Sequence, residues 1–220
     1  MEVSFERIKN DEAIREYIKA ADRSLLALGY TEHSFAHVTR VAEVAAELLL
    51  ELGYSEKDAE LARIAGFMHD IGNLVNREEH SQSGAVMAFR ILDNMGMPPE
   101  DIAKVVTAIG NHDEGTGIPV SPLAAALILA DKSDVRRTRV RNSDLKTFDI
   151  HDRVNYSVTS SSLVIEKHKS SVTLNILIDT AISSLMDYFE IFLSRMKLCK
   201  RAAETLGLDF NLVINERKFM

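Results

Sequence analysis

Apolar residues recur at every third or fourth position from the start of the chain to about Val140, which is the period of helices with one buried face. Glycines, prolines and N-capping residues divide this region into predicted helices. These cover residues 11–28, the run from Ser34 to Gly53, the run from Ser55 to "MHDIG", about 81–95, "EDIAKVVTAIGNH" after Pro98 and Pro99, and a run that starts at Ser121-Pro122. The pattern predicts a helical bundle.

The pattern changes after about residue 148. The stretches "RVNYSVTSSSLVIE" (153–166) and "SVTLNILID" (171–179) alternate β-branched with polar residues, and "KHKS" between them is typical of a hairpin turn. A helix over about 183–206 and a further alternating run, "DFNLVINERKF", are expected after them. We therefore predict a mainly α protein, with a helical domain at 1–148 and a small α+β appendage of two or three strands and one helix at 149–220.

Composition and charge exclude several classes of protein. The 220 residues carry a net charge of −7, which argues against general nucleic-acid binding. The single cysteine, Cys199, rules out a disulfide within the chain and is interpreted as structural. The charged N-terminal segment lacks an apolar signal core, and no apolar run approaches the ~20 residues that cross a bilayer. We expect a soluble cytoplasmic protein that does not bind membranes.

Titratable residues interrupt the apolar faces of the predicted helices, as in "IAGFMHDIGN" (64–73). A single histidine on such a face is more often a hydrogen-bonded core residue than a ligand. Here, however, several of them end the apolar faces of successive helices, which predicts a shared polar pocket with ligands for a divalent first-row metal. The residues concerned are His33, His37, His69, Asp70, His80, His112 and Asp131. His151 and His168 flank the strand signals and are predicted to be surface residues.

The ordered set of His37, then His69-Asp70 in "MHDIG", then Asp131 in "ILADKSD" resembles the signature of the HD-domain superfamily of metal-dependent phosphohydrolases. The resemblance covers roughly residues 30 to 140. It implies an all-helical bundle in which these four residues hold one metal ion.

Superfamily members with two ions add two histidines, and His80 in "HSQSGA" and His112 in "IGNHDEG" match those positions. The resemblance therefore implies two divalent ions per chain, drawn from Mn, Fe, Co, Ni or Zn, with Asp70 bridging them. The stretch "NHDEGTGIP" is also similar to the HD-GYP cyclic-di-GMP phosphodiesterases. It departs from their pattern, because Ile118 replaces the tyrosine and Asn73 replaces the lysine after "HDIG".

The implied reaction is attack of a metal-activated water on the phosphorus of a nucleotide or a small phosphorylated metabolite. Asp70 and Lys132 are the predicted catalytic residues. His33, Lys132 and Arg136 are predicted to bind substrate, because the basic run "DKSDVRRTRVRNSDLK" follows Asp131 directly. The simpler interpretation of that run is a solvated, charged helix end, and His33 could equally bind a third metal or be an ordinary polar residue.

Two other functions are compatible with the same residues. One is a di-iron oxygenase of the HD type, and the other is a non-catalytic module that senses nucleotides or metals. The appendage carries no motif. It is expected either to pair two chains in a homodimer, since exposed strands often pair with a partner, or to act as a lid over the metal site.

Overall fold

The helices predicted from the apolar period are present in the computed structural model, which describes residues 3–166, 168 and 170–220. The N-terminal part contains α1 (Phe5–Lys9), α2 (Glu12–Ala27), α3 (Phe35–Glu51), α4 (Glu56–Met68), the 3₁₀ turn η1 (Ile71–Leu74), α5 (His80–Asn94), α6 (Pro99–Gly110) and α7 (Pro122–Ser133). Among the described residues, every helix is too short or too polar to span a bilayer.

Small residues let the central helices approach closely. At Gly66 of α4, an added Cβ atom would lie 2.6 Å from the Cα atom of Ala42 on α3, so only glycine fits at this crossing. The buried alanines Ala45, Ala62 and Ala65 line the same helix pair. This close contact sets the distance between the two helices that carry His37 and His69.

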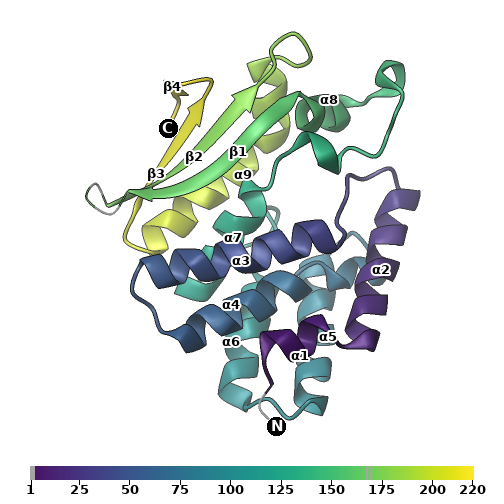
Figure 1. The fold of residues 1–220 in the computed structure, drawn as a ribbon, viewed down its shortest axis with the longest axis vertical. Coiled ribbons are helices and arrows are strands. Elements are labelled where there is room, and N and C mark those ends of the chain that lie inside the picture. Colours follow the sequence, from purple (N-terminus) through teal and green to yellow (C-terminus); the bar gives the residue numbers. More distant parts are fainter. Residues whose placement is uncertain (1–2, 167, 169) are drawn as a thin grey trace.

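The C-terminal part combines a small sheet with helices (Figure 1). It contains η2 (Arg137–Arg139), η3 (Leu145–Thr147), α8 (Ile150–Ser157), β1 (Val158–Glu166), β2 (Ser171–Ile178), α9 (Leu185–Thr205), β3 (Asp209–Ile214) and β4 (Arg217–Lys218). The strand order is β1-β2-β3-β4. β1 and β2 pair antiparallel as predicted, whereas β2 and β3 pair in parallel, with α9 as the crossover helix between them. The predicted "KHKS" turn includes residues 167 and 169 and so lies partly outside the described residues.

The strand predicted over 153–166 begins too early. Residues 150–157 form α8, because the Asp149 side chain accepts a hydrogen bond from the Asp152 N–H and caps the helix. The alternating pattern becomes a strand only at Val158. The described appendage therefore holds two helices and four strands, one helix and at least one strand more than predicted.

The fold class is confirmed as mainly α, with a helical bundle and a small C-terminal α+β part. One continuous hydrophobic core joins the two parts: α7 packs on α3 on one side and on α9 on the other. The boundary at 148/149 stays a prediction.

Candidate metal centre

All six predicted metal ligands meet at one place in the fold, although they come from separate elements. His37 lies on α3, His69 follows α4, Asp70 precedes η1, His80 begins α5, His112 follows α6 and Asp131 lies near the end of α7. The four histidines and Asp70 are buried, and the Asp131 side chain is only 11% exposed.

Four of these side chains form a first set of ligand atoms. His37 Nε2 lies 3.3 Å from His69 Nε2 and 3.4 Å from Asp131 Oδ1. Asp70 Oδ2 lies 3.2 Å from His69 Nε2 and 3.6 Å from His37 Nε2. Ligand atoms about 2.1 Å from one ion are about 3.0 to 3.4 Å apart in tetrahedral or octahedral geometry. The spacing of this set therefore suits a single divalent ion.

The second oxygen of Asp70 faces a second set. Asp70 Oδ1 lies 3.5 Å from His80 Nε2 and 3.9 Å from His112 Nε2, and these two nitrogens are 3.2 Å apart. Asp70 thus presents one oxygen to each set, which is the arrangement that a bridging carboxylate requires.

The Nδ1 atom of each imidazole, which faces away from the cluster, shows whether these residues can bind a cation. Each Nδ1 lies within hydrogen-bond distance of an acceptor: Asp134 Oδ2 for His37, Gly66 O for His69, Arg77 O for His80 and Ile109 O for His112. Nδ1 therefore carries the proton in the neutral rings, and each Nε2 offers a lone pair.

These Nε2 lone pairs point at one another and at carboxylate oxygens. Among the described residues, Arg77 lies beside these nitrogens as a donor, with Nη1 3.4 Å from His80 Nε2. Asp70 Oδ2 is buried and accepts no hydrogen bond from a described residue. Such a cluster of acceptors is costly unless a cation is shared between them, so the residues fit divalent metal.

The charged and polar groups of the cluster shift one another's pKa values. Burial disfavours the charged form of Asp70, but the neighbouring imidazoles, His69 above all, hold its pKa well below the ordinary value. Burial alone would lower the pKa of His69, but the attraction of the Asp70 carboxylate is stronger than this effect, so the pKa of His69 is raised overall. For His112, burial dominates and holds the pKa well below the usual range, which keeps this imidazole neutral.

Close backbone packing fixes the second half of the site. A Cβ atom at Gly72 would lie 2.0 Å from the His80 carbonyl oxygen, so η1 and the start of α5 lie directly against each other. This contact brings Asp70, which precedes η1, to His80, which begins α5.

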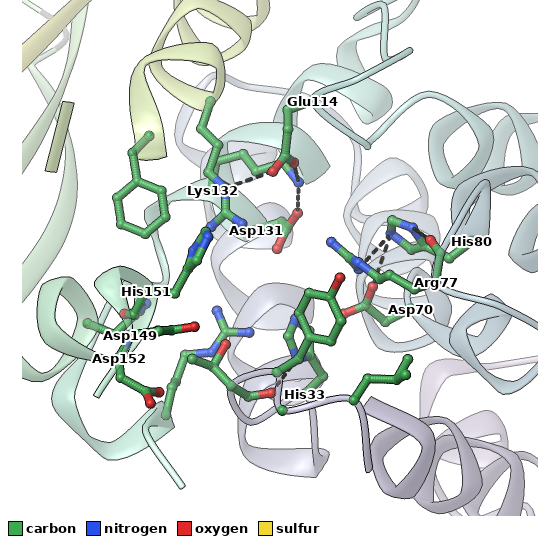
Figure 2. A pocket seen from close by; sticks show the side chains of 18 of the residues that line it. His33, Asp70, Arg77, His80, Glu114, Asp131, Lys132, Asp149, His151 and Asp152 are labelled. Atoms are coloured by element: carbon green, nitrogen blue, oxygen red, sulfur yellow. Dashed lines mark hydrogen bonds and ion pairs between the residues drawn. The ribbon is translucent and has the colours of Figure 1, made fainter. Parts of the chain in front are cut away.

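A pocket of about 460 Å³ opens onto the cluster (Figure 2). Asp70, His80, His112 and Asp131 form one wall. Asp149, His151 and Asp152, from α8 and its cap, lie across the pocket from Asp70 and His80 (Figure 2), and Asn155 of α8 also lines the pocket. The remaining lining includes Tyr30, His33, Arg77, Glu114, Lys132, Arg139, Phe192 and Arg195. A volume of this size is typical of sites for small molecules.

Two of the three predicted substrate-binding residues lie in this pocket. Lys132 is buried, with Nζ 2.7 Å from Asp131 Oδ2 and 2.7 Å from Glu114 Oε2. His33 lines the pocket, and its ring packs against His37. Burial holds the pKa of His33 well below its usual value, so it is neutral at pH 7.

Arg136 is placed differently from the prediction. Its guanidinium pairs with Asp134 at 2.8 Å and with Glu32 at 3.4 Å, and it is not among the described residues that line the pocket. Arg139, from the same basic run, does line the pocket. A role for Arg136 in substrate binding stays a prediction, and Arg139 is the arginine of this run that lines the pocket.

Several neighbours of the site were missed at the level of sequence. Asn73 donates to Asp70 Oδ1 at 3.0 Å, so it orients the Asp70 carboxylate. Asp134, three residues after Asp131, holds His37. His151 is exposed as predicted, yet it lines the pocket, as Arg195 of α9 also does. "DKSD" was a visible signal for Asp134, whereas a local pattern offers none for Arg195.

Comparisons with known proteins agree with this geometry. The model of the HD domain family matches residues 34–154. Ribonuclease Y of Fervidobacterium nodosum is 29% identical over 136 residues, which are 60% of this chain and 24% of that protein. The chain therefore spans about a quarter of that relative's length.

A longer match is the uncharacterized protein MJ1020 of Methanocaldococcus jannaschii, 26% identical over 210 residues, 84% of this chain and 78% of that protein. Among solved structures, a predicted HD superfamily hydrolase from an uncultured Thermotogales bacterium is 25% identical, with a TM-score of 0.43, and the match covers 60% of this chain and 73% of that one.

Proposed function

Because this chain belongs to the HD domain family, we propose that it is a metal-dependent phosphohydrolase that acts on a phosphate ester or phosphoanhydride of a nucleotide or a small phosphorylated metabolite. The observation that carries the proposal is the buried cluster of Nε2 lone pairs and carboxylate oxygens, with one Asp70 oxygen facing each of two ligand sets. A pocket of small-molecule size opens directly onto this cluster.

His37, His69, Asp70 and Asp131 would hold one ion, and Asp70, His80 and His112 the other. When bound, such ions lower the pKa of coordinated water towards about 7 and offset negative charge on a phosphoryl group. The chain itself contributes orientation. The Nδ1 contacts fix each imidazole, and Asn73 fixes Asp70, so the ligand atoms are already aligned before substrate arrives.

The pocket is also suited to an anionic substrate. Arg77, Lys132, Arg139 and Arg195 line it and are cationic at neutral pH. Lys132 is tied to Asp131 and Glu114, and the two carboxylates outweigh the effect of burial and raise its pKa above the ordinary lysine value. Its charge is therefore permanent, and we propose that it offsets charge on the reacting phosphoryl group beside Asp131.

The proposal is tested by elemental analysis of purified protein coupled to phosphate release. Nucleotides and phosphomonoesters are the substrates, with Mn²⁺, Co²⁺, Ni²⁺ or Fe²⁺ added. Wild type should hold about two ions per chain, whereas Asp70→Ala should lose metal and all metal-dependent release, because it removes a ligand from both sets. His168→Ala, which removes an exposed histidine, is the matched control and should behave as wild type.

Three results would contradict the proposal. Metal binding without phosphate release from any substrate would favour the sensing module. Substrate-dependent oxygen consumption with iron would favour the oxygenase. If Asp70→Ala kept its full metal content, the assignment of the site itself would be wrong.

A further inference from the structure

The cations that line the pocket differ in how many of their N–H groups are already used. Arg139 is buried and donates to two backbone carbonyls, Glu32 O at 2.9 Å and Asp134 O at 2.8 Å. Lys132 is shared between Asp131 and Glu114. Both of these cations are committed mainly to the protein itself.

Arg195 of α9 uses fewer of its N–H groups than these two. Its Nε donates to Glu114 Oε1 at 2.9 Å, and among the described residues no acceptor takes a hydrogen bond from its Nη1 or Nη2. The side chain is 23% exposed and lines the pocket. The outer edge of the guanidinium therefore keeps its N–H groups for an anion that enters the pocket.

Two contacts hold this guanidinium in place. Glu114 fixes it at Nε, and the ring of Phe192 lies 4.6 Å from its central carbon. Both Phe192 and Glu114 also line the pocket. An arginine held on one edge and one face loses little further freedom when its other edge binds an oxyanion, and its planar fork matches phosphate oxygens.

Arg195 is also close to the metal ligands through a short chain of ion pairs. Glu114 joins it to Lys132, and Lys132 contacts Asp131, with oxygen–nitrogen distances of 2.9, 2.7 and 2.7 Å along the chain. The two cations and the two carboxylates balance each other. A dianionic phosphate at Arg195 is thus not opposed by uncompensated negative charge from Glu114.

We infer that Arg195 is a phosphate-binding residue, so that the appendage completes the active site by supplying an anion contact from α9. This inference rests on the proposed function for its setting, because the phosphate it holds would belong to the substrate. α9 already lines the pocket through Phe192 and Arg195, so this contact needs neither a moving lid nor a second chain; both of those expectations for the appendage stay predictions.

The test measures binding of inorganic phosphate to the metal-loaded protein by isothermal titration calorimetry, so it does not depend on turnover of any substrate. Arg195→Gln should weaken phosphate binding by about 10-fold or more, the usual effect of losing a charge-assisted hydrogen bond. Arg195→Lys keeps the charge but loses the planar fork, so its phosphate affinity should lie between those of wild type and Arg195→Gln. Lys200→Gln removes an exposed charge from the same helix outside the pocket and should bind phosphate as wild type does.

Metal content separates an anion contact from an effect on the ligands. Arg195→Gln should retain the wild-type number of ions, because Arg195 touches none of the predicted ligands directly. Wild-type phosphate affinity in Arg195→Gln would overturn the inference. So would a loss of metal along with phosphate, since Arg195 would then act on Asp131 through Glu114 and Lys132. Absence of hydrolysis with every substrate would instead count against the proposed function and leave this result standing.

Discussion

Asp134→Asn should weaken one of the two proposed metal sites and leave the other nearly unchanged. Asp134 is buried, and its Oδ2 lies 2.8 Å from His37 Nδ1, where it fixes the ring and makes Nε2 a stronger ligand. Asparagine keeps the shape of the side chain but removes the negative charge. Carboxylates in this position typically change metal affinity by 10- to 100-fold, which is about 1.4 to 2.7 kcal/mol.

The assay is a titration of metal-free protein with Co²⁺, followed by visible absorption. Because His37 belongs only to the first ligand set, one of two binding phases should shift and the other should stay. Asp101→Asn is the control: Asp101 is also buried and ion-paired, but with Lys57 at 2.7 Å.

Loss of stability in both variants is expected and does not bear on the metal. Asp134 Oδ1 pairs with Arg40 and Arg136, so its charge also matters to the fold. Only Asp134→Asn should change Co²⁺ affinity. Wild-type affinity in that variant would refute the claim that the Nδ1 partners prepare the imidazoles for metal.

Two further predictions concern pH and packing. Because the pKa of His69 is raised in the metal-free protein, its ion pair with Asp70 stabilises that form fully below about pH 6.5 and is lost as pH rises through the raised pKa. Metal binding must displace the His69 proton, so Co²⁺ affinity should rise from pH 5.5 to 8, and calorimetry in buffers of different ionisation enthalpy should detect the released proton. A pH-independent Co²⁺ affinity would contradict this prediction. Gly72→Ala should lower the free energy of unfolding by about 2 to 3 kcal/mol in urea titrations, because its Cβ atom would lie 2.0 Å from the His80 carbonyl oxygen. Gly115→Ala, whose Cβ atom meets only the Asp113 carboxylate at 3.1 Å, should cost far less, and equal losses would show that the close contact is not the cause.

The sequence allowed the clustering of the candidate metal ligands to be predicted because helical period and ligand chemistry are both local signals. His37, His69 and Asp131 each lie at one end of an apolar stripe, and a bundle must bring such stripes together. The six ligands meet as expected. The capping serines Ser34 and Ser121 likewise mark helix starts that the structure contains.

The sequence was least informative where tertiary contacts outweigh the local pattern. Residues 153–157 contain β-branched and aromatic residues, but the Asp149 cap and the burial of Val154 make them helical. Arg136 was chosen because it follows Asp131 closely, yet Asp134 and Glu32 hold it. Arg195 could not be found, because only the packing of α9 on α7 brings it to the site.

That packing also bears on whether the appendage can be removed. α7 carries Asp131 and Lys132 and is buried along most of its length, with α3 on one side and α9 on the other. Removing α9 would expose the apolar residues of α7 on the side that faces it, and would leave Glu114 paired only with Lys132. Because α7 carries Asp131, we expect the candidate metal centre to need the packing of α9, even though every predicted metal ligand precedes the appendage in the chain.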